Sequence, residues 1–483
     1  MVGIVSYGIY IPRYRLDRKQ AFQSIGWLNP STAAYAKGEK AVANYDEDSI
    51  TMATEACMNC IRDRDQSHIE GLYFASTTMP YKERQNSVII ATALNLPEDI
   101  RTADFSSGLR SATTALLSSI DTVKAGSSKD ILICSSDERL GKMGTTDEML
   151  FGDAACALLI GSEDVIAEFK GSYSLSLDFV DHHRGSISRY ERSWEERWIR
   201  DEGLNKIIPS TIRGLLNRFN LKIEDLSKIL ISLPFPMPPK RMAKIIKTDP
   251  EVLEDTMITQ IGYTGSPHPL LMLVKAVEDS RPGDRLLLLS IGNGSDAMIF
   301  EVKDKIRDLR KDMDFKRFLK RKIPLSYEKY TVFKNLAEAD LGLRAEEDIW
   351  TRWSFMWRNR KTILGLVGSR CKVCHTPQYP PQHVCVNPDC GAIDQMEEYP
   401  FSYRRGRIFN YTADMLAASI DPPAIHGQID FEGGGRFWFD FTDCTLDDLR
   451  VGMRVRMSFR KKYYDEKRDI CGYFWKAVPE KEG

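Results

Sequence analysis

Four cysteines in two closely spaced pairs are the residues of this sequence best suited to hold a metal. Two residues separate Cys371 from Cys374, four separate Cys385 from Cys390, and ten lie between the pairs. Two such turns can place four thiolates tetrahedrally around Zn²⁺, which makes a closed structural site with no open position for catalysis. The other six cysteines are scattered and nothing else indicates an oxidising compartment. We therefore predict structural zinc rather than disulfides.

A strongly basic run is the second feature that could bind a ligand. Residues 303–322 carry ten lysines and arginines against four aspartates. Such a run is typical of a solvated helix face or a linker. The alternative is a patch that binds the phosphates of a nucleotide-bearing substrate, with Arg317, Lys320 and Arg321 as the contacting residues.

Length and composition narrow the function classes. A chain of 483 residues with 42% hydrophobic residues can bury full cores, and its length suggests roughly three domains. The formal charge is −1, so no global basic field exists to hold a nucleic acid or an anionic membrane. The N-terminus lacks the pattern of a signal peptide, and no apolar stretch reaches the length of a membrane span. We expect a cytoplasmic protein without nucleic-acid or membrane partners.

Residues 1–302 alternate short apolar runs with amphipathic stretches, which is typical of an α/β fold whose sheets are covered by helices. A turn of small residues followed by a strand-like run occurs twice, at 151–161 and 292–302, and suggests two similar halves. The expected strands are 4–10, 71–76, 131–135, 154–160, 229–233, 286–290 and 297–302, and the expected helices are 48–62, 108–125, 206–219 and 269–279.

The remainder of the chain changes character in three steps. Residues 303–365 are predicted to be a basic helical linker, in which Trp350, Trp353 and Trp357 lie on one helix face for core or interface packing. Residues 366–396 hold the cysteine pairs and are predicted to form a zinc ribbon. Short strands near 407–411, 435–440 and 454–459 predict a small β-barrel over residues 397–483.

Several motifs resemble the thiolase superfamily, specifically hydroxymethylglutaryl-CoA synthase and ketoacyl-ACP synthase III. They are GIVSYGIYIP at 3–12, ADFSSGLRSATTAL at 103–116, FGDAACALLIG at 151–161 and GNGSDA at 292–297. The resemblance implies a five-layered fold of two similar halves. Residues 366–483 are similar to the zinc-ribbon and OB-fold domain that accompanies thiolase-like enzymes and engages acyl-CoA, through the cysteine pairs, GGGR at 433–436 and DFTD at 440–443.

The same resemblance implies that the four catalytic positions of the family are replaced. The cysteine that accepts the acyl group falls at Ser107, the histidine at Ser232, the asparagine at Tyr263 and the glutamate near Thr77. A serine without an adjacent base is a poor nucleophile because almost none of it is ionised at neutral pH. We therefore expect that cysteine-based Claisen condensation is not the chemistry of this chain, although its pocket can still bind a CoA thioester.

A thiolase-like site without its cysteine can still run aldol or retro-aldol chemistry on a β-hydroxyacyl-CoA, which needs an acid, a base and hydrogen-bond donors. Tyr263 and His268 are the candidates for acid and base, with Ser107 and Ser232 as donors. Each has an ordinary structural alternative: a packed aromatic, a core or capping histidine, and a helix N-cap. His182 follows Asp181 and is either a pocket residue or part of an exposed loop.

Three hypotheses follow. In the first, the chain is a pseudoenzyme that binds acyl-CoA and acts in carbon–carbon bond formation or cleavage together with a thiolase-type catalytic subunit. In the second, it is an autonomous aldolase or lyase that uses Tyr263 and His268. In the third, it is a hydroxymethylglutaryl-CoA-synthase-like acyltransferase that uses Ser107 as nucleophile. The resemblance implies either a homodimer or a heteromeric complex with a thiolase-type subunit.

Overall fold

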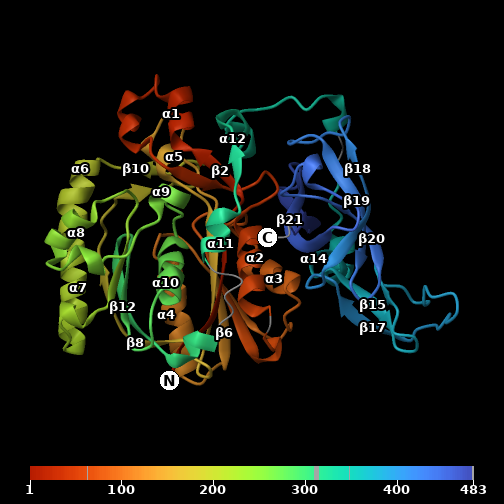
Figure 1. Ribbon diagram of the computed structural model, residues 1–483, viewed down its shortest axis with the longest axis horizontal. Helices are drawn as coiled ribbons and strands as arrows, with labels where there is room; N and C mark the ends of the chain where they lie inside the picture. The colour runs from red at the N-terminus through yellow and green to blue at the C-terminus, as the bar shows by residue number, and fades with distance from the viewer. Residues whose placement is uncertain (63, 309–314, 347–348, 481–483) are drawn as a thin grey trace.

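One mixed sheet of nine strands organises the first 302 residues (Figure 1). The computed structural model describes residues 1–62, 64–308, 315–346 and 349–480. The strand order is β11-β12-β13-β8-β1-β7-β6-β4-β5. Strands β1 and β8 pair through only two residues on each strand, so the sheet consists of two halves joined at one corner. The strands are β1 Gly3–Tyr10, β4 Ile69–Ala75, β5 Arg101–Phe105, β6 Asp130–Asp137, β7 Ala154–Gly161, β8 Ala167–Ser176, β11 Lys228–Ser232, β12 Arg285–Ile291 and β13 Gly294–Val302.

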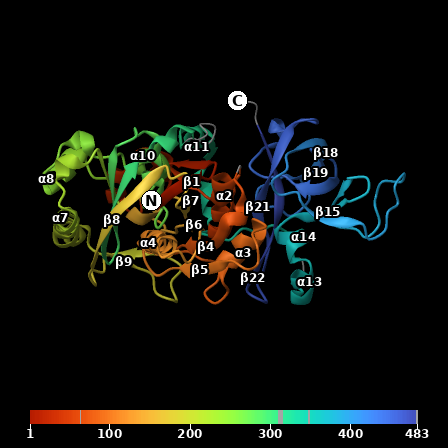
Figure 2. The same ribbon diagram turned by 90° about the horizontal axis from the view of Figure 1, so that it is seen from below.

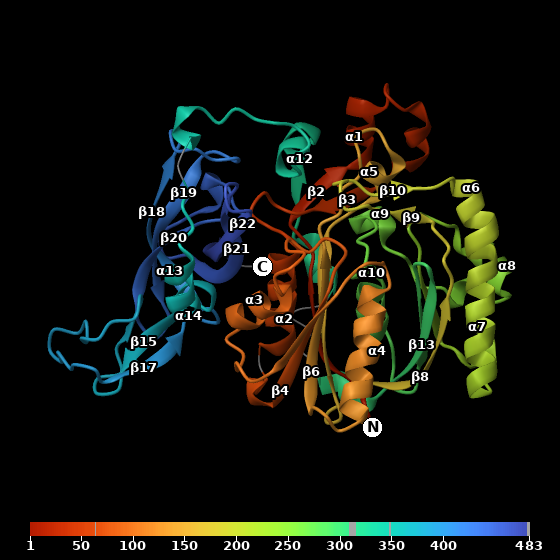
Figure 3. The same ribbon diagram turned by 180° about the vertical axis from the view of Figure 1, so that it is seen from behind.

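Helices cover both faces of the two half-sheets and make five layers (Figures 1 and 3). Helices α4 (Ser111–Lys124) and α10 (His268–Glu278) lie against each other between the halves; α4 packs on strands of the first half, and α10 packs on β11 and β12 of the second and on β7 of the first. Helices α2 (Ser49–Ile61) and α3 (Asn86–Ala93) cover the outer face of the first half. On the second half, the same role belongs to α7 (Asn205–Phe219) and α8 (Pro239–Ile246).

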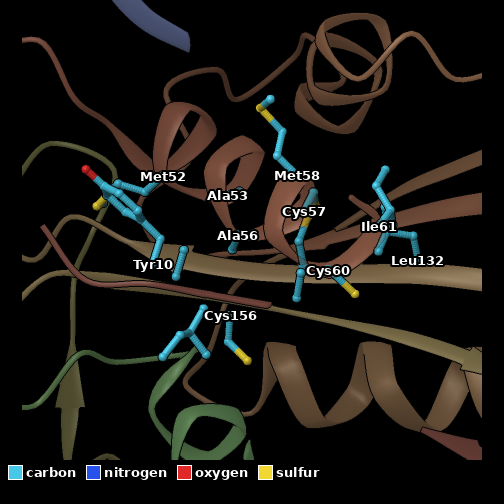
Figure 4. Packing of buried hydrophobic residues seen from close by; sticks show 14 of the residues in the cluster. Tyr10, Met52, Ala53, Ala56, Cys57, Met58, Cys60, Ile61, Leu132 and Cys156 are labelled. Atoms are coloured by element: carbon cyan, nitrogen blue, oxygen red, sulfur yellow. The ribbon is translucent and has the colours of Figure 1, made fainter. Parts of the chain in front are cut away.

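Helix α2 shows why these segments form the core. All but one of its thirteen residues are buried, because the sheet covers one side and the C-terminal barrel covers another (Figure 4). Eight of the thirteen are apolar, more than a helix with one solvated face needs. Small residues such as Ala53 and Ala56 allow it to lie close to β1. A Cβ on Gly8 of β1 would lie 2.2 Å from the carbonyl oxygen of Ala56, so this approach requires glycine.

The sequence-based expectations for the first 302 residues are confirmed. All seven predicted strands and all four predicted helices occur, with ends that differ from the expected ones by at most three residues. The two repeated turns lead into β7 and β13, which occupy equivalent places in the two halves. The fold is thiolase-like, as the motifs implied.

The C-terminal part forms two small sheets; the larger one lies beside α2, and the smaller one lies farther from the first domain (Figure 2). A three-stranded sheet carries the cysteine turns, and a five-stranded OB-like sheet follows it in the order β20-β19-β18-β21-β22. The three predicted short strands are present: 407–411 and 454–459 are parts of longer strands, and 435–440 corresponds to a strand that is one residue shorter. The strands are β15 Val367–Cys371, β16 Pro377–Gln378, β17 Met396–Pro400, β18 Gly406–Asp414, β19 Ala424–Phe431, β20 Arg436–Asp440, β21 Arg454–Asp465 and β22 Ile470–Pro479.

The segment expected to be a helical linker is less helical than predicted. β14 (Ile323–Leu325) pairs in parallel with β2 (Tyr14–Asp17), and α12 (Tyr327–Phe333) packs on the first domain. Gly342 has φ +76°, outside the helical range, and α13 (Trp353–Arg358) begins only after it. The three tryptophans are at least 60% exposed, so they are not core residues, and an interface role stays a prediction. The domain boundaries at 302, 365 and 396 also stay predictions.

Within the described part of the chain, no helix has both the length and the apolar character required to cross a membrane.

Candidate functional site

Two neighbouring cavities open where the carboxyl ends of several strands meet. The inner cavity, about 720 Å³, lies between Leu109, Phe151, Phe235 and Glu191. The outer cavity, about 900 Å³, is bounded by Ser107, Thr77, Asn293 and the loop 182–189. His182, Ser188 and Glu191 line both cavities, so the two are contiguous there. This position is the usual one for a ligand in an α/β fold.

A buried ion pair forms the polar wall of the inner cavity. The Nε atom of Arg139 lies 2.9 Å from Oε1 of Glu191, and a second bond joins the guanidinium to the other carboxylate oxygen. Both side chains are nearly inaccessible to solvent. Burial opposes the charge of Arg139, but Glu191 more than compensates and holds the pKa of the guanidinium above its ordinary value. The guanidinium also stacks on the ring of Phe151 at 3.6 Å. A substrate in this cavity therefore meets a neutralised pair rather than a free positive charge.

Tyr263 and His268 lie together behind this wall. Their ring centroids are 4.9 Å apart, and Tyr263 packs with Leu109 and Phe151 of the cavity wall. Burial raises the pKa of Tyr263 to about 12, against the opposing charge of Arg139. Neither residue lines either cavity.

The ring of His268 has both nitrogens engaged. Nδ1 accepts from the N–H of Thr264 at 3.2 Å, so Nε2 carries the proton and donates to the carbonyl of Thr256 at 2.8 Å. Burial lowers the pKa of this histidine to about 4, which keeps it neutral. In this geometry His268 stabilises the turn that carries Tyr263, through its hydrogen bonds to Thr264 and Thr256.

Ser107 and Ser232 occupy different places. Ser232 ends β11 and is buried. Its hydroxyl lies near that of Tyr263 and acts to lower the pKa of the tyrosine, but it makes no hydrogen bond of ordinary geometry to another described residue. Ser107 is exposed in the turn before α4 and faces the outer cavity. The side chain that this turn presents to the inner cavity and to Tyr263 is Leu109. The structure brings Tyr263, His268 and Ser232 together but separates Ser107 from them.

The remaining sequence candidates are also placed. The N–H of Thr77 donates to the buried carboxylate of Asp137 at 2.6 Å, which leaves Thr77 at the rim of the outer cavity. Arg317 and Lys320 belong to α11 (Phe315–Lys320), and Arg321 follows it; none of the three lines either cavity.

Sequence reasoning assigned no role to Arg139 or Glu191, which form the polar wall of the inner cavity. Arg139 and Glu191 come together from loops 52 residues apart, and no motif marks either one. The sequence marked His182 only by its place after Asp181, because a histidine next to a carboxylate is a possible pocket residue. Its Nδ1 lies 2.9 Å from Oδ1 of Asp181.

The four ribbon cysteines converge as predicted. Their sulfur atoms all lie within 4.8 Å of one another, with 3.4 Å between Cys374 and Cys385 and 3.9 Å between Cys371 and Cys390. Thiolates around a tetrahedral Zn²⁺ at 2.3 Å are about 3.8 Å apart, so the donor set fits this ion. Residues 363–394 match the family described as ChsH2, rubredoxin-like zinc ribbon domain.

Sequence relatives identify the larger part of the chain. The hydroxymethylglutaryl-CoA synthase of Aeropyrum pernix is 31% identical over 337 residues, which cover 68% of this chain and 92% of the relative. The corresponding protein of Pyrococcus horikoshii is 31% identical over 318 residues, 64% of this chain and 89% of the relative. The chain belongs to the hydroxymethylglutaryl-CoA synthase family.

Solved structures agree with the fold of this synthase family. A hydroxymethylglutaryl-CoA synthase complexed with CoA is 23% identical, with a TM-score of 0.61 over 73% of this chain and 94% of the other. A Xanthomonas campestris OleA variant with bound lauric acid and lauroyl-CoA is 17% identical, with a TM-score of 0.55 over 62% of this chain and 98% of the other.

This synthase-family member differs from a cysteine enzyme at its cavities. Among the described residues that line the inner and outer cavities, none is a cysteine. Four of the six cysteines outside the ribbon are buried in the core of the first domain, and the other two lie in the C-terminal barrel. A thioester in either cavity therefore meets serine, histidine, arginine and carboxylate groups.

Proposed function

We propose that this protein binds an acyl-CoA with the acyl group in the inner cavity and acts in forming or cleaving a carbon–carbon bond of the thioester without a cysteine-bound acyl group. The observation that carries this proposal is the cavity wall itself. It combines apolar residues such as Leu109 and Phe151 with the polar groups of Glu191 and His182, and no described cysteine lines it. An apolar chamber with a few converging polar groups is the usual form of a small-molecule site.

The proposal includes a partner. A chain that binds a thioester but lacks the cysteine of its family can pass that thioester to a catalytic subunit, and the attached zinc ribbon and barrel give it an additional surface for such a complex. We propose a thiolase-type subunit as that partner, or a homodimer where none is present. Light scattering of the purified chain, alone and with a thiolase, tests this part, and a monomer that ignores the thiolase would refute it.

Filling the inner cavity tests ligand placement. Ser193 is exposed, lies at the end of the β9–β10 hairpin and lines the inner cavity. Ser193→Trp is expected to weaken acetoacetyl-CoA binding at least tenfold, or about 1.4 kcal/mol, because the indole would occupy the space of the acyl group. Isothermal calorimetry on the full chain measures the change.

The matched control is Ser127→Trp, at an exposed loop position that lines neither cavity. It is expected to bind acetoacetyl-CoA as the wild type does. Equal affinity in Ser193→Trp and the wild type would place the thioester elsewhere, and no binding to the wild type would remove the proposal.

Charge reversal tests the phosphate contacts expected at α11. Replacing Arg317, Lys320 and Arg321 together by glutamate is expected to weaken CoA binding by about tenfold at low salt and less at physiological salt, where exposed charges are screened over about 8 Å. The control is Lys129→Glu, an exposed charge on a distant loop. Unchanged CoA affinity in the triple variant would exclude these residues as phosphate ligands.

A further inference from the structure

The inner cavity is larger than a small acyl group requires. Its volume of about 720 Å³ lies within the range of about 300–1,000 Å³ that holds a drug-sized ligand. An acetyl or acetoacetyl group is several times smaller than such a ligand and would leave most of the space unfilled. Unfilled space beside an apolar wall forfeits the dispersion contacts that ligand atoms would make there. The size of the cavity therefore favours an acyl group with many carbon atoms.

One part of the cavity wall is apolar and comes from four separate segments. These are the turn before α4, the end of helix α5 (Thr146–Leu150), the start of the π-helical turn Ile199–Leu204, and the loop after β11. The core clusters of the protein include these residues, so packing fixes the wall in place. The apolar lining residues of these segments are Leu109, Leu150, Phe151, Ile199, Pro234 and Phe235.

The polar groups deep in the same wall are engaged within the protein. They form four pairs, each with a contact of 2.9 Å: Arg139–Glu191, His182–Asp181, Ser193–Asp147 and Tyr35–Glu196. Nη1 of Arg139 makes no hydrogen bond, but solvent does not reach it, so it does not face the cavity. A ligand on this wall leaves these pairs intact without supplying partners of its own, which suits a hydrocarbon chain.

Large apolar side chains are exposed at the mouth of the inner cavity. Trp194 lines the cavity and is 58% exposed. Leu28 precedes the lining residue Asn29, and Met143 follows another lining residue; both are also exposed. The side chain of Asn29 donates to the carbonyl of Gly144 at 3.0 Å, so the two loops adjoin each other. Exposed apolar side chains that gather at an opening can cover the part of an acyl chain that extends beyond it.

We propose that the acyl group bound in the inner cavity is a medium- or long-chain hydrocarbon group, so that the protein selects hydrophobic acyl-CoA thioesters over acetyl- and acetoacetyl-CoA. This inference rests on the proposed function, because it requires the acyl group to lie in the inner cavity. The thioester carbonyl lies where the two cavities meet, beside His182 and Ser188. The hydrocarbon chain extends from there along Phe151 and Phe235, and the outer cavity is left to the rest of the thioester.

A series of saturated thioesters from acetyl-CoA to decanoyl-CoA tests this inference on the full chain. Each methylene that becomes buried is expected to strengthen binding by about fourfold. Decanoyl-CoA is therefore expected to bind about a hundredfold or more tightly than acetyl-CoA, with one site per chain. Isothermal calorimetry measures both the affinity and the stoichiometry.

Two variants test whether the hydrocarbon lies in the inner cavity. Thr146→Trp fills space at a half-buried lining position, and Phe235→Gln keeps much of the side-chain volume but makes the wall polar. Each is expected to reduce the gain from acetyl- to decanoyl-CoA by at least about tenfold. Circular dichroism checks folding, and one folded variant suffices. The matched controls are Ser127→Trp and Phe409→Gln, at exposed positions that line neither cavity, and both are expected to retain the full gain.

The outcomes separate this inference from the proposed function. Binding that strengthens with chain length in the wild type, and loses that gain in a folded cavity variant, supports both. Equal affinity for every thioester overturns the inference and leaves the proposed function intact. A chain-length gain that survives in both Thr146→Trp and Phe235→Gln overturns the inference together with the acyl placement on which it rests. Absence of binding by every thioester overturns both.

Discussion

Replacing Cys374 by serine is expected to remove the zinc and unfold the ribbon while the first domain remains folded. Binding of zinc to four thiolates contributes on the order of 10 kcal/mol to a small domain, and loss of one ligand opens the tetrahedral site. Hydrogen bonds to Thr376 lower the pKa of Cys374 to about 6, which favours the thiolate that binds metal. Metal analysis by mass spectrometry and limited proteolysis between residues 371 and 396 measure the two effects.

Cys471→Ser is the control for this experiment. Cys471 lies on β22, outside the ribbon and away from the four converging sulfurs. This variant is expected to retain its zinc and its resistance to protease. A full complement of zinc in Cys374→Ser would show that the four cysteines do not act as one closed site, and a collapse of the whole protein would show that the ribbon is not a separate unit.

Periodicity and spacing predicted most of the scaffold. The strands of the central sheet are short apolar runs bounded by small or polar residues, so their places follow from local sequence. The cysteine spacing alone predicted the convergence of four sulfurs. The segment 323–365 was the main difference. The helical spacing of its tryptophans is used only in part, because Trp353 and Trp357 lie in the short helix α13 while Trp350 precedes it.

The functional site was less accessible to prediction because its polar groups come together only in three dimensions. Arg139 and Glu191 form a buried pair between two loops. In the sequence, each is a charged residue of a type usually found on the surface. The family resemblance led to Ser107, but the structure was needed to place Leu109 on the inner cavity and Ser107 on the outer one. The engaged nitrogens of His268 likewise depend on backbone positions that sequence patterns do not encode.

A buried charge network joins the C-terminal barrel to the first domain. Arg460 of β21 is fully buried, with contacts of 3.2 Å to Asp46, 2.7 Å to Glu47 and 2.8 Å to Asp443. Burial raises the pKa of Glu47 to about 8, with the neighbouring acids adding to the increase and Arg460 opposing it. Burial opposes ionisation of Asp46, yet Lys476 and Arg460 lower its pKa to about 2. Two acids precede α2 and the arginine belongs to the barrel, so this network fixes the two domains against each other.

Removing the central cation of this network is expected to have the largest effect on stability of any single substitution in the C-terminal barrel. Arg460→Met preserves much of the side-chain volume but leaves Asp46, Glu47 and Asp443 without their shared partner, which typically costs about 3–5 kcal/mol. Urea unfolding followed by circular dichroism measures this loss. The control Arg436→Met removes a half-exposed partner of Asp430 on the barrel surface, where the expected loss is below about 1 kcal/mol. Equal losses in the two variants would show that the network contributes no more than a surface pair. A large loss in Arg460→Met alone, together with earlier proteolytic separation of the barrel from the first domain, would show that the network stabilises the interface between the two, since the acids that lose Arg460 belong to both sides.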